Sequence, residues 1–150
     1  MKTVIQRVGR ASVSVDGEVV GEIGPGLLVL LGVEVGDTTS DADALVDKIS
    51  CLRLFPGKTP MDLSVRDVGG ACLVVSQFTL SGSVRKGRRP SFSSAEAPDK
   101  AVALYEYFAG MLRGRGIPVE TGRFGASMQV ELVNDGPVTL LVNTHAGTIA

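Results

Sequence analysis

Residues 11–35 read ASVSVDGEVVGEIGPGLLVLLGVEV, and this stretch decides the fold class. Apolar and polar residues alternate on both sides of Asp16-Gly17, and such a pair between alternating runs is the strongest short signal for a β-hairpin. The run at 27–35 is almost continuously apolar, as in a central strand that is covered on both faces. The chain therefore begins with a β-sheet whose central strand is buried.

Two helices are expected further along the chain. Either Thr38 or Ser40 can cap the first, whose apolar residues recur at helical spacing at Ala42, Leu45, Val46, Ile49 and Leu52. Pro98 can begin the second, whose apolar face would hold Val102, Tyr105, Phe108, Ala109 and Leu112.

Further strands are expected at 71–80, 117–125, 127–133 and 137–143, which gives the order β-β-β-α-β-α-β-β-β. This order predicts an α/β fold with layered β-sheets and helices packed on one side.

The bulk composition indicates one soluble globular domain over residues 1–150. The chain is 44% hydrophobic and 21% charged, with a net charge of −1. Residues 143–150 are small and polar, and we expect them to form a frayed tail. No segment has the length of a signal peptide core or of a membrane span, which predicts a cytoplasmic protein with no membrane partner.

The chain offers few side chains for conventional catalysis. His145 is the one histidine, and no Cys/His cluster has the spacing of a zinc site. Neither a P-loop nor a dinucleotide fingerprint follows a strand. An enzyme with this sequence would work without metal, cofactor or strong side-chain base. An activated ester is a suitable substrate, because backbone N–H donors and a positioned water or hydroxyl can suffice.

Ser76, Gln77 and Thr79 bring polar groups to the end of a buried strand, a usual position for sites in α/β sheets. Alternation would place Gln77 and Thr79 on one face, and Ser76 and Phe78 on the other. The alternative interpretation is a strand-end motif in which these side chains bond to the local backbone.

The segment RKGRRP at 85–90 concentrates positive charge: Arg85, Lys86, Arg88 and Arg89 occur without an acidic neighbour. A phosphate partner would relieve their mutual repulsion, which favours RNA or a nucleotide, whereas the alternative is a solvated loop. Aromatic residues make up 5% of the chain and tryptophan is absent, which argues against a platform that reads single strands by base stacking.

The stretch NDGPVT at 134–139 lies between two runs that read as strands. Asp-Gly and Gly-Pro are both turn signals, so the local interpretation is a turn between two strands.

Eight motifs in order resemble those of the bacterial D-aminoacyl-tRNA deacylases, the D-tyrosyl-tRNA deacylase family. They are VIQRV (4–8), ASVSVDGEVVGEIGPGLLVLLGVE (11–34), MDLSV (61–65), DVGG (67–70), LVVSQFTL (73–80), RKGRRPSFS (85–93), ETGRFGASMQV (120–130) and NDGPVTLLV (134–142). The resemblance extends over residues 1–142. The chain departs from the family pattern at SGSV (81–84) and at PGKTP (56–60), which leaves the path of the tRNA open but touches neither signature motif.

The resemblance implies a homodimeric hydrolase that edits mischarged tRNA by cleaving the ester between a D-amino acid and the 3′ end, and that also removes glycine. The implied catalytic group is Ser76, Gln77, Phe78 and Thr79. The Gly136-Pro137 bond is expected to be cis and to reach into the partner's site, where its carbonyls face the substrate's α-carbon and exclude L-amino acids.

Two further residues carry over from the resemblance. Arg7 would hold the Gly-Pro corner, and Met128 would line the pocket; the alternatives are an exposed strand arginine and a core methionine. The family mechanism relies on backbone groups and the 2′-hydroxyl of the terminal adenosine, which leaves Thr79 a positioning role. The expected partner is tRNA, held by the cations at 85–89, with no DNA, metal or cofactor.

Two other functions compete with this hypothesis. One is a noncatalytic RNA-binding module that uses residues 85–89. The other is a small-ester or amide hydrolase that uses Thr79 or Cys72 without RNA. The Ser-Gln-Phe-Thr stretch together with the Gly-Pro pair favours the deacylase over the first, and the basic segment favours it over the second.

Overall fold

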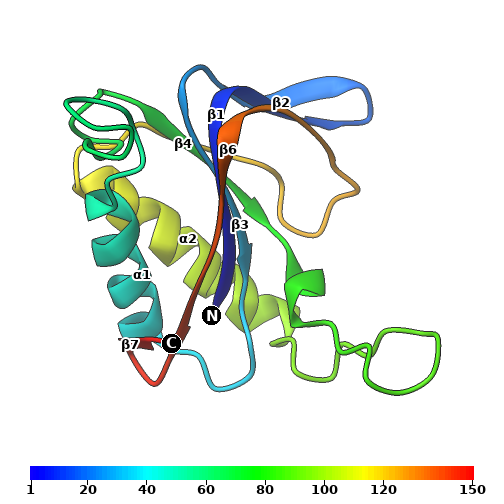
Figure 1. Ribbon diagram of the computed structural model, residues 1–150. Coiled ribbons are helices and arrows are strands. Elements are labelled where there is room, and N and C mark those ends of the chain that lie inside the picture. Colours follow the sequence, from blue (N-terminus) through cyan, green and yellow to red (C-terminus); the bar gives the residue numbers. More distant parts are fainter.

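A computed structural model describes residues 1–150 as one α/β domain, in which a mixed seven-stranded sheet carries two α-helices (Figure 1). The sheet order is β5-β4-β3-β1-β6-β7, and β2 pairs with β1. Strands β3, β4 and β5 are parallel, whereas β1 is antiparallel to its three neighbours. The elements are β1 (Lys2–Val15), β2 (Glu18–Ile23), β3 (Gly26–Gly32), α1 (Thr39–Cys51), β4 (Ala71–Ser76), the 3-10 helix η1 (Phe78–Ser81), α2 (Pro98–Gly114), β5 (Val119–Thr121), β6 (Gln129–His145) and β7 (Thr148–Ile149).

The single sheet curls, which corrects the expectation of several layered sheets. The first half of β1 pairs with β3, and its second half, from Ala11 onward, pairs with β2. Arg7 and Val8 are buried in succession, so the buried face of β1 changes sides at this point. One core of 23 buried residues therefore lies between sheet and helices, and a smaller core of 7 lies on the other face.

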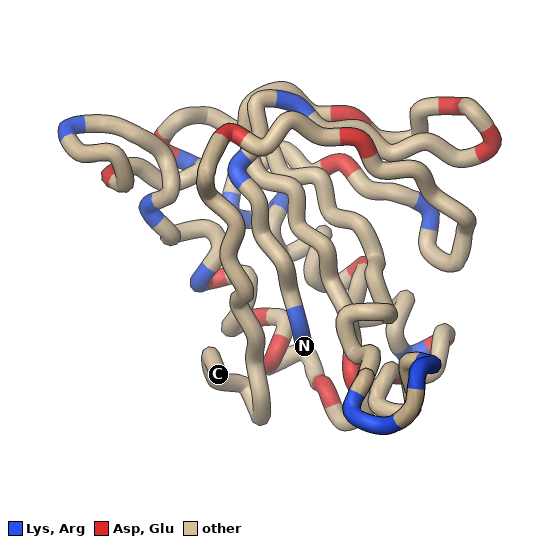
Figure 2. Tube along the Cα trace, turned by 45° about the vertical axis from the view of Figure 1, so that its right-hand side comes forward, with Lys and Arg blue, Asp and Glu red and all other residues tan.

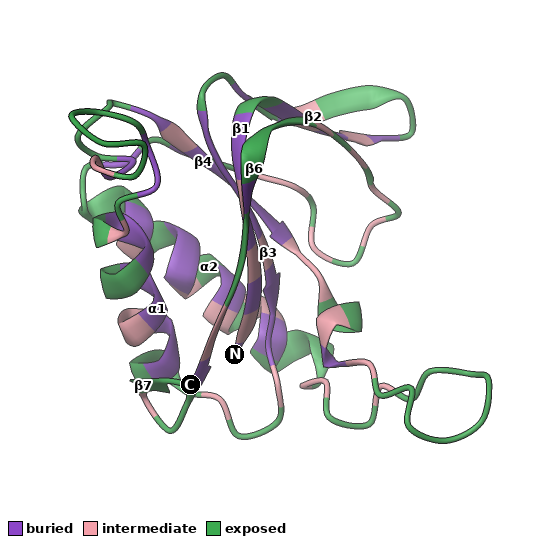
Figure 3. Ribbon diagram, viewed as in Figure 1, coloured by how far each residue is buried: buried purple, intermediate pink, exposed green.

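Both helices cover the same side of the sheet, as predicted (Figures 1 and 3). Most residues of the predicted apolar faces are buried, but Val102 of α2 is only half-buried, and Leu52 is a half-buried residue just after the end of α1. Thr38 is the N-cap of α1, and its N–H donates to the Asp41 carboxylate over 3.0 Å. Pro98 is the first residue of α2. Neither helix is long and apolar enough to cross a lipid bilayer.

The prediction of two strands at 127–133 and 137–143 is wrong, because residues 129–133 and 137–143 belong to one strand, β6. Val8 pairs with Asn134 and Gln6 pairs with Thr139, so residues 135–138 bulge from the ladder opposite Arg7 alone. A bulge satisfies the same Gly and Pro preferences as a turn, but it leaves the strand direction unchanged.

The expected frayed tail is also wrong. Thr144 is buried, its carbonyl accepts from the Met1 amino group over 3.0 Å, and β7 pairs with the end of β6. The N–H of Gly147 donates to the Asp41 carboxylate over 2.9 Å, which fastens the tail to the start of α1.

Candidate active site

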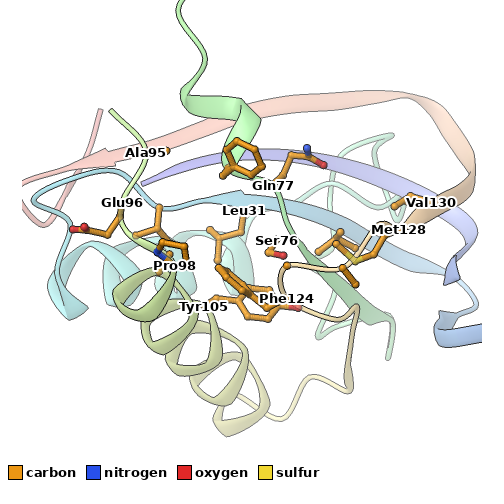
Figure 4. A pocket seen from close by; sticks show the side chains of 16 residues that line it. Leu31, Ser76, Gln77, Ala95, Glu96, Pro98, Tyr105, Phe124, Met128 and Val130 are labelled. Atoms are coloured by element: carbon orange, nitrogen blue, oxygen red, sulfur yellow. The ribbon is translucent and has the colours of Figure 1, made fainter. Parts of the chain in front are cut away.

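A cavity of about 440 Å³ lies between the end of β4, the start of α2 and the segment that leads into β6 (Figure 4). Eleven of its sixteen lining residues are hydrophobic, and Tyr105 and Phe124 form part of its wall. These rings lie 5.9 Å apart, and the Tyr105 hydroxyl donates to the Val74 carbonyl over 2.8 Å. A cavity that is largely apolar with a few polar groups is typical of a ligand site.

Ser76, Gln77 and Phe78 line this cavity, and Met128 lines it from the segment just before β6. The structure therefore brings together four of the residues that the sequence singled out. Thr79 is exposed and does not line the cavity, although the Gln77 side-chain amide donates to its hydroxyl.

The predicted alternation of faces from 76 to 79 is wrong. The strand ends at Ser76, and η1 begins at Phe78, so the period of two no longer applies. The N–H groups of Phe78 and Thr79 open this short helix, where no intrahelical acceptor exists. The corner therefore leaves two backbone N–H groups close to Ser76 in the chain without an intrahelical acceptor.

Arg7 of β1 supports the bulge of β6 through hydrogen bonds. Its guanidinium donates from Nε to the Asp135 carbonyl over 3.0 Å, and from Nη1 to the Leu54 carbonyl. Nε also lies 3.2 Å from the Asp135 carboxylate. Arg7 is buried, which excludes the alternative of an exposed strand arginine.

Asn134 closes the bulge from its other end. Its side-chain amide donates to the carbonyls of Arg7, over 2.9 Å, and Val138, over 3.1 Å. Between these anchors, Gly136 and Pro137 are exposed and joined by a cis peptide bond. Sequence reasoning missed Asn134 and treated it only as a turn residue.

Arg7, Gly136 and Pro137 do not line the cavity of their own chain. The bulge belongs to β6, whose outer edge pairs with no strand from Gln129 to Val142 and is largely exposed (Figure 3). The candidate residues thus form two separate groups: one at the cavity and one on the β6 bulge.

The basic segment forms the tip of a hairpin, which we call the basic hairpin (residues 83–91). Ser83 and Ser91 exchange backbone hydrogen bonds of 2.8 and 2.9 Å at its base, and Gly87 takes a positive φ of 68° at its tip. The four cations are exposed, and none forms an ion pair. Figure 2 marks the positions of the basic residues in blue along the chain. Because Phe78 and Ala95 both line the cavity, the hairpin rises from the cavity's rim.

No group of three or more His, Cys, Asp or Glu side chains could hold a metal ion. His145 is exposed at the end of β6 and does not line the cavity. Glu96 is the one carboxylate in the lining, and its Oε1 accepts from the N–H of Ala97 over 2.8 Å.

Cys72 is buried in β4, and its burial raises the pKa of the thiol to about 12. A thiol held neutral in this way is a poor nucleophile. We expect dithiobis(nitrobenzoate) to modify the exposed Cys51 in the native protein, and Cys72 only after unfolding. Peptide mapping of the modified native protein would check this, and rapid labelling of Cys72 would contradict it.

Comparison with known proteins yields a consistent set of relatives. A family model described as D-Tyr-tRNA(Tyr) deacylase matches residues 4–143. A protein of Anaeromyxobacter dehalogenans named D-aminoacyl-tRNA deacylase is 59% identical over 146 residues, which are 97% of this chain and 98% of the relative. A protein of the same name from Chloroflexus aurantiacus is 58% identical over 145 residues, 96% of this chain and 91% of the relative.

Two solved structures are similar over nearly the whole chain. One is titled c-Myc DNA Unwinding Element Binding Protein, with a TM-score of 0.91, 42% identity, and coverage of 97% of this chain and 100% of that chain. The other is a probable eukaryotic D-amino acid tRNA deacylase, with a TM-score of 0.76, 21% identity, and coverage of 93% and 97%. The second likeness concerns the fold alone.

Proposed function

The chain belongs to the D-Tyr-tRNA(Tyr) deacylase family, and from this membership we propose that it hydrolyses the ester between a D-amino acid and the 3′ end of tRNA. The observation that carries the proposal is the Ser76–Phe78 strand end, which opens on an apolar cavity beside a hairpin of unpaired cations. The proposed place of action is the cytoplasm, where tRNA is charged.

The proposed chemistry depends on positioning. An aminoacyl ester is activated, so a held water or the 2′-hydroxyl of the terminal adenosine can act with little help. The N–H group of Phe78, a residue that lines the cavity, is the candidate oxyanion donor, and one such donor contributes about 3–4 kcal/mol to transition-state stabilisation. Thr79 positions Gln77 through their hydrogen bond, because no histidine or carboxylate contacts its hydroxyl to act as a base.

We assign chiral selection to the β6 bulge of a partner subunit in a homodimer. Two observations support this: the bulge is exposed on an unpaired strand edge, and the cavity lacks any contribution from it. Val133 and Leu141 on the same strand are 45% and 75% exposed, which is apolar surface that a second subunit would cover. A wall of backbone carbonyls would exclude an L side chain by contact and would admit the hydrogen atom of glycine.

The decisive experiment is amino-acid release from D-tyrosyl-, L-tyrosyl- and glycyl-tRNA under identical conditions. We expect release of D-tyrosine and glycine and retention of L-tyrosine. Equal release of both tyrosine enantiomers would contradict the chiral wall. No release from any of the three would contradict the deacylase function itself.

The basic hairpin is proposed to contact tRNA phosphates. Replacing Arg88 and Arg89 with alanine should weaken tRNA binding and lower its log-log salt slope by about 0.7–0.9 for each lost contact. The matched control replaces Lys48 and Lys58, two exposed cations in α1 and in the 52–70 segment, and should leave the slope unchanged. Filter binding at several salt concentrations measures both slopes.

The same assay compares tRNA with a DNA hairpin of matched length. One structural relative is named as a DNA-binding protein. Contacts to phosphates alone do not distinguish RNA from DNA. We expect aminoacylated tRNA to bind more tightly than DNA, because the cavity takes its charged 3′ end. Equal affinities would support a general nucleic-acid surface instead.

A further inference from the structure

Phe78 lies at the rim of the cavity, where it both lines the cavity and faces solvent. Its ring helps to line the cavity, yet the residue is 59% exposed. Phe92 meets it edge to face, with ring centroids 5.2 Å apart and an interplanar angle of 70°. Since Phe92 directly follows Ser91 at the base of the basic hairpin, the two rings connect the cavity rim to the cations.

The chain fixes this pair at several points. A Cβ atom at Gly82 would lie 2.9 Å from Cε1 of Phe92, so the ring packs closely on the glycine backbone. The Ser94 hydroxyl donates to the Ser81 carbonyl over 2.9 Å, which ties the two ends of the hairpin together. Phe92 is therefore held firmly in place, and Phe78 packs against it while 59% of Phe78 stays exposed and open to a ligand.

A supported aromatic ring beside unpaired cations is the combination that binds single-stranded nucleic acid, with bases stacked on rings and phosphates near the charges. The low aromatic content of the sequence excludes a wide platform, but one ring is enough for one base. The cavity volume of about 440 Å³ is that of a site for a single small ligand, so a strand whose last nucleoside enters the cavity must place its preceding base outside.

We propose that Phe78, braced by Phe92, stacks on the base of the nucleotide that precedes the terminal adenosine of tRNA, while the linking phosphates face the basic hairpin. This inference rests on the proposed function and adds a second nucleotide subsite to it. The subsite binds a base by stacking and not by hydrogen bonds, so it accepts any of the four bases. Its position beside the cavity fixes the direction in which the strand enters.

Three nonhydrolysable ligands test the subsite. The first is adenosine with a D-amino acid on its 3′ position through an amide. The second adds a 5′ cytidylate, and the third adds the same nucleotide without its base. Calorimetry at one salt concentration should give about tenfold tighter binding of the second ligand than of the third.

Phe78→Leu should abolish most of that difference, whereas Phe78→Tyr should retain it. Phe92→Leu should reduce it, and Arg88→Ala should weaken the second and third ligands equally. Circular dichroism of each variant establishes that it is folded. Equal binding of the second and third ligands to the wild type would overturn the subsite, as would an undiminished difference in Phe78→Leu. Failure of the first ligand to bind would instead overturn the proposed function.

Discussion

Replacing Arg7 with methionine is expected to lower kcat/KM for D-aminoacyl-tRNA by about 100-fold, because the bulge is the proposed wall that positions the substrate and a misplacement of about 1 Å can cost that much. Methionine keeps the length of the buried side chain but offers no donor. The carbonyls of Asp135 and Leu54 then lose their shared partner, and the bulge at 135–138 loses its support. Each unpaired carbonyl costs about 1–3 kcal/mol if it stays buried, so the bulge should instead rearrange toward water.

The matched control is Arg10→Met on the same strand. Arg10 is 67% exposed at its side chain, and its 3.6 Å ion pair with Glu131 is exposed too. Such a pair contributes little to stability, so this variant should retain activity and folding. Equal losses in both variants would show that the effect is general to cations on β1 and not specific to the bulge.

A mixing experiment separates a shared site from a site within one chain. Arg7→Met damages the bulge, and Gln77→Ala damages the cavity group; each variant alone should be nearly inactive. In a mixed dimer, the intact bulge of one chain would meet the intact cavity of the other. Refolding the two together should restore about a quarter of wild-type activity, since half the dimers are mixed and each holds one complete site. No recovery would contradict the cross-subunit assignment.

The periodicity of the sequence was sufficient to predict the helices and the central strands. Burial at Leu45, Ile49, Phe108 and Leu112 follows directly from helical spacing, since these residues must face one sheet. The sequence also brought Ser76, Gln77 and Met128 into one candidate site, which the structure gathers around one cavity. The resemblance supplied the last of these, because a methionine in a strand carries no signal of its own.

Other features depend on long-range contacts that no local pattern encodes. Asp135, Gly136 and Pro137 satisfy a turn and a bulge equally well, and the choice depends on Arg7, which lies 128 residues from Asp135 and 127 residues from Asn134 in the chain. The C-terminal tail was likewise predicted to be frayed, because its hydrogen-bond partners are Met1 and Asp41, which lie far from it in the sequence. The contact between Phe78 and Phe92 could not be predicted from the sequence either, because composition gives the number of aromatic rings but not their positions in space.

Gly26→Ala is expected to be the most damaging single methyl addition for folding. Gly26 begins β3, where it pairs with Val8 on one side and with Ala71 on the other. A Cβ atom at this position would lie 1.8 Å from the Ala71 carbonyl oxygen and 2.8 Å from its carbon and nitrogen. These atoms belong to the backbone of a central parallel pair, so no side chain can rotate away to make room.

Relief of that overlap requires β3 and β4 to separate at their first hydrogen-bonded pair, which leads into both cores. We expect a loss of more than about 4 kcal/mol in the free energy of unfolding, against a total stability of about 5–15 kcal/mol for a domain of this kind.

Gly24→Ala is the matched control, because it adds the same methyl group two residues earlier, with nothing within 4 Å. Denaturant unfolding of the two variants should give a normal midpoint for Gly24→Ala and little folded protein for Gly26→Ala. Equal unfolding midpoints of the two variants would mean that the backbones of Gly26 and Ala71 lie farther apart than the pairing of β3 with β4 places them. The packing that places Ser76 at the cavity would then need another explanation, since β4 reaches that cavity only through this register.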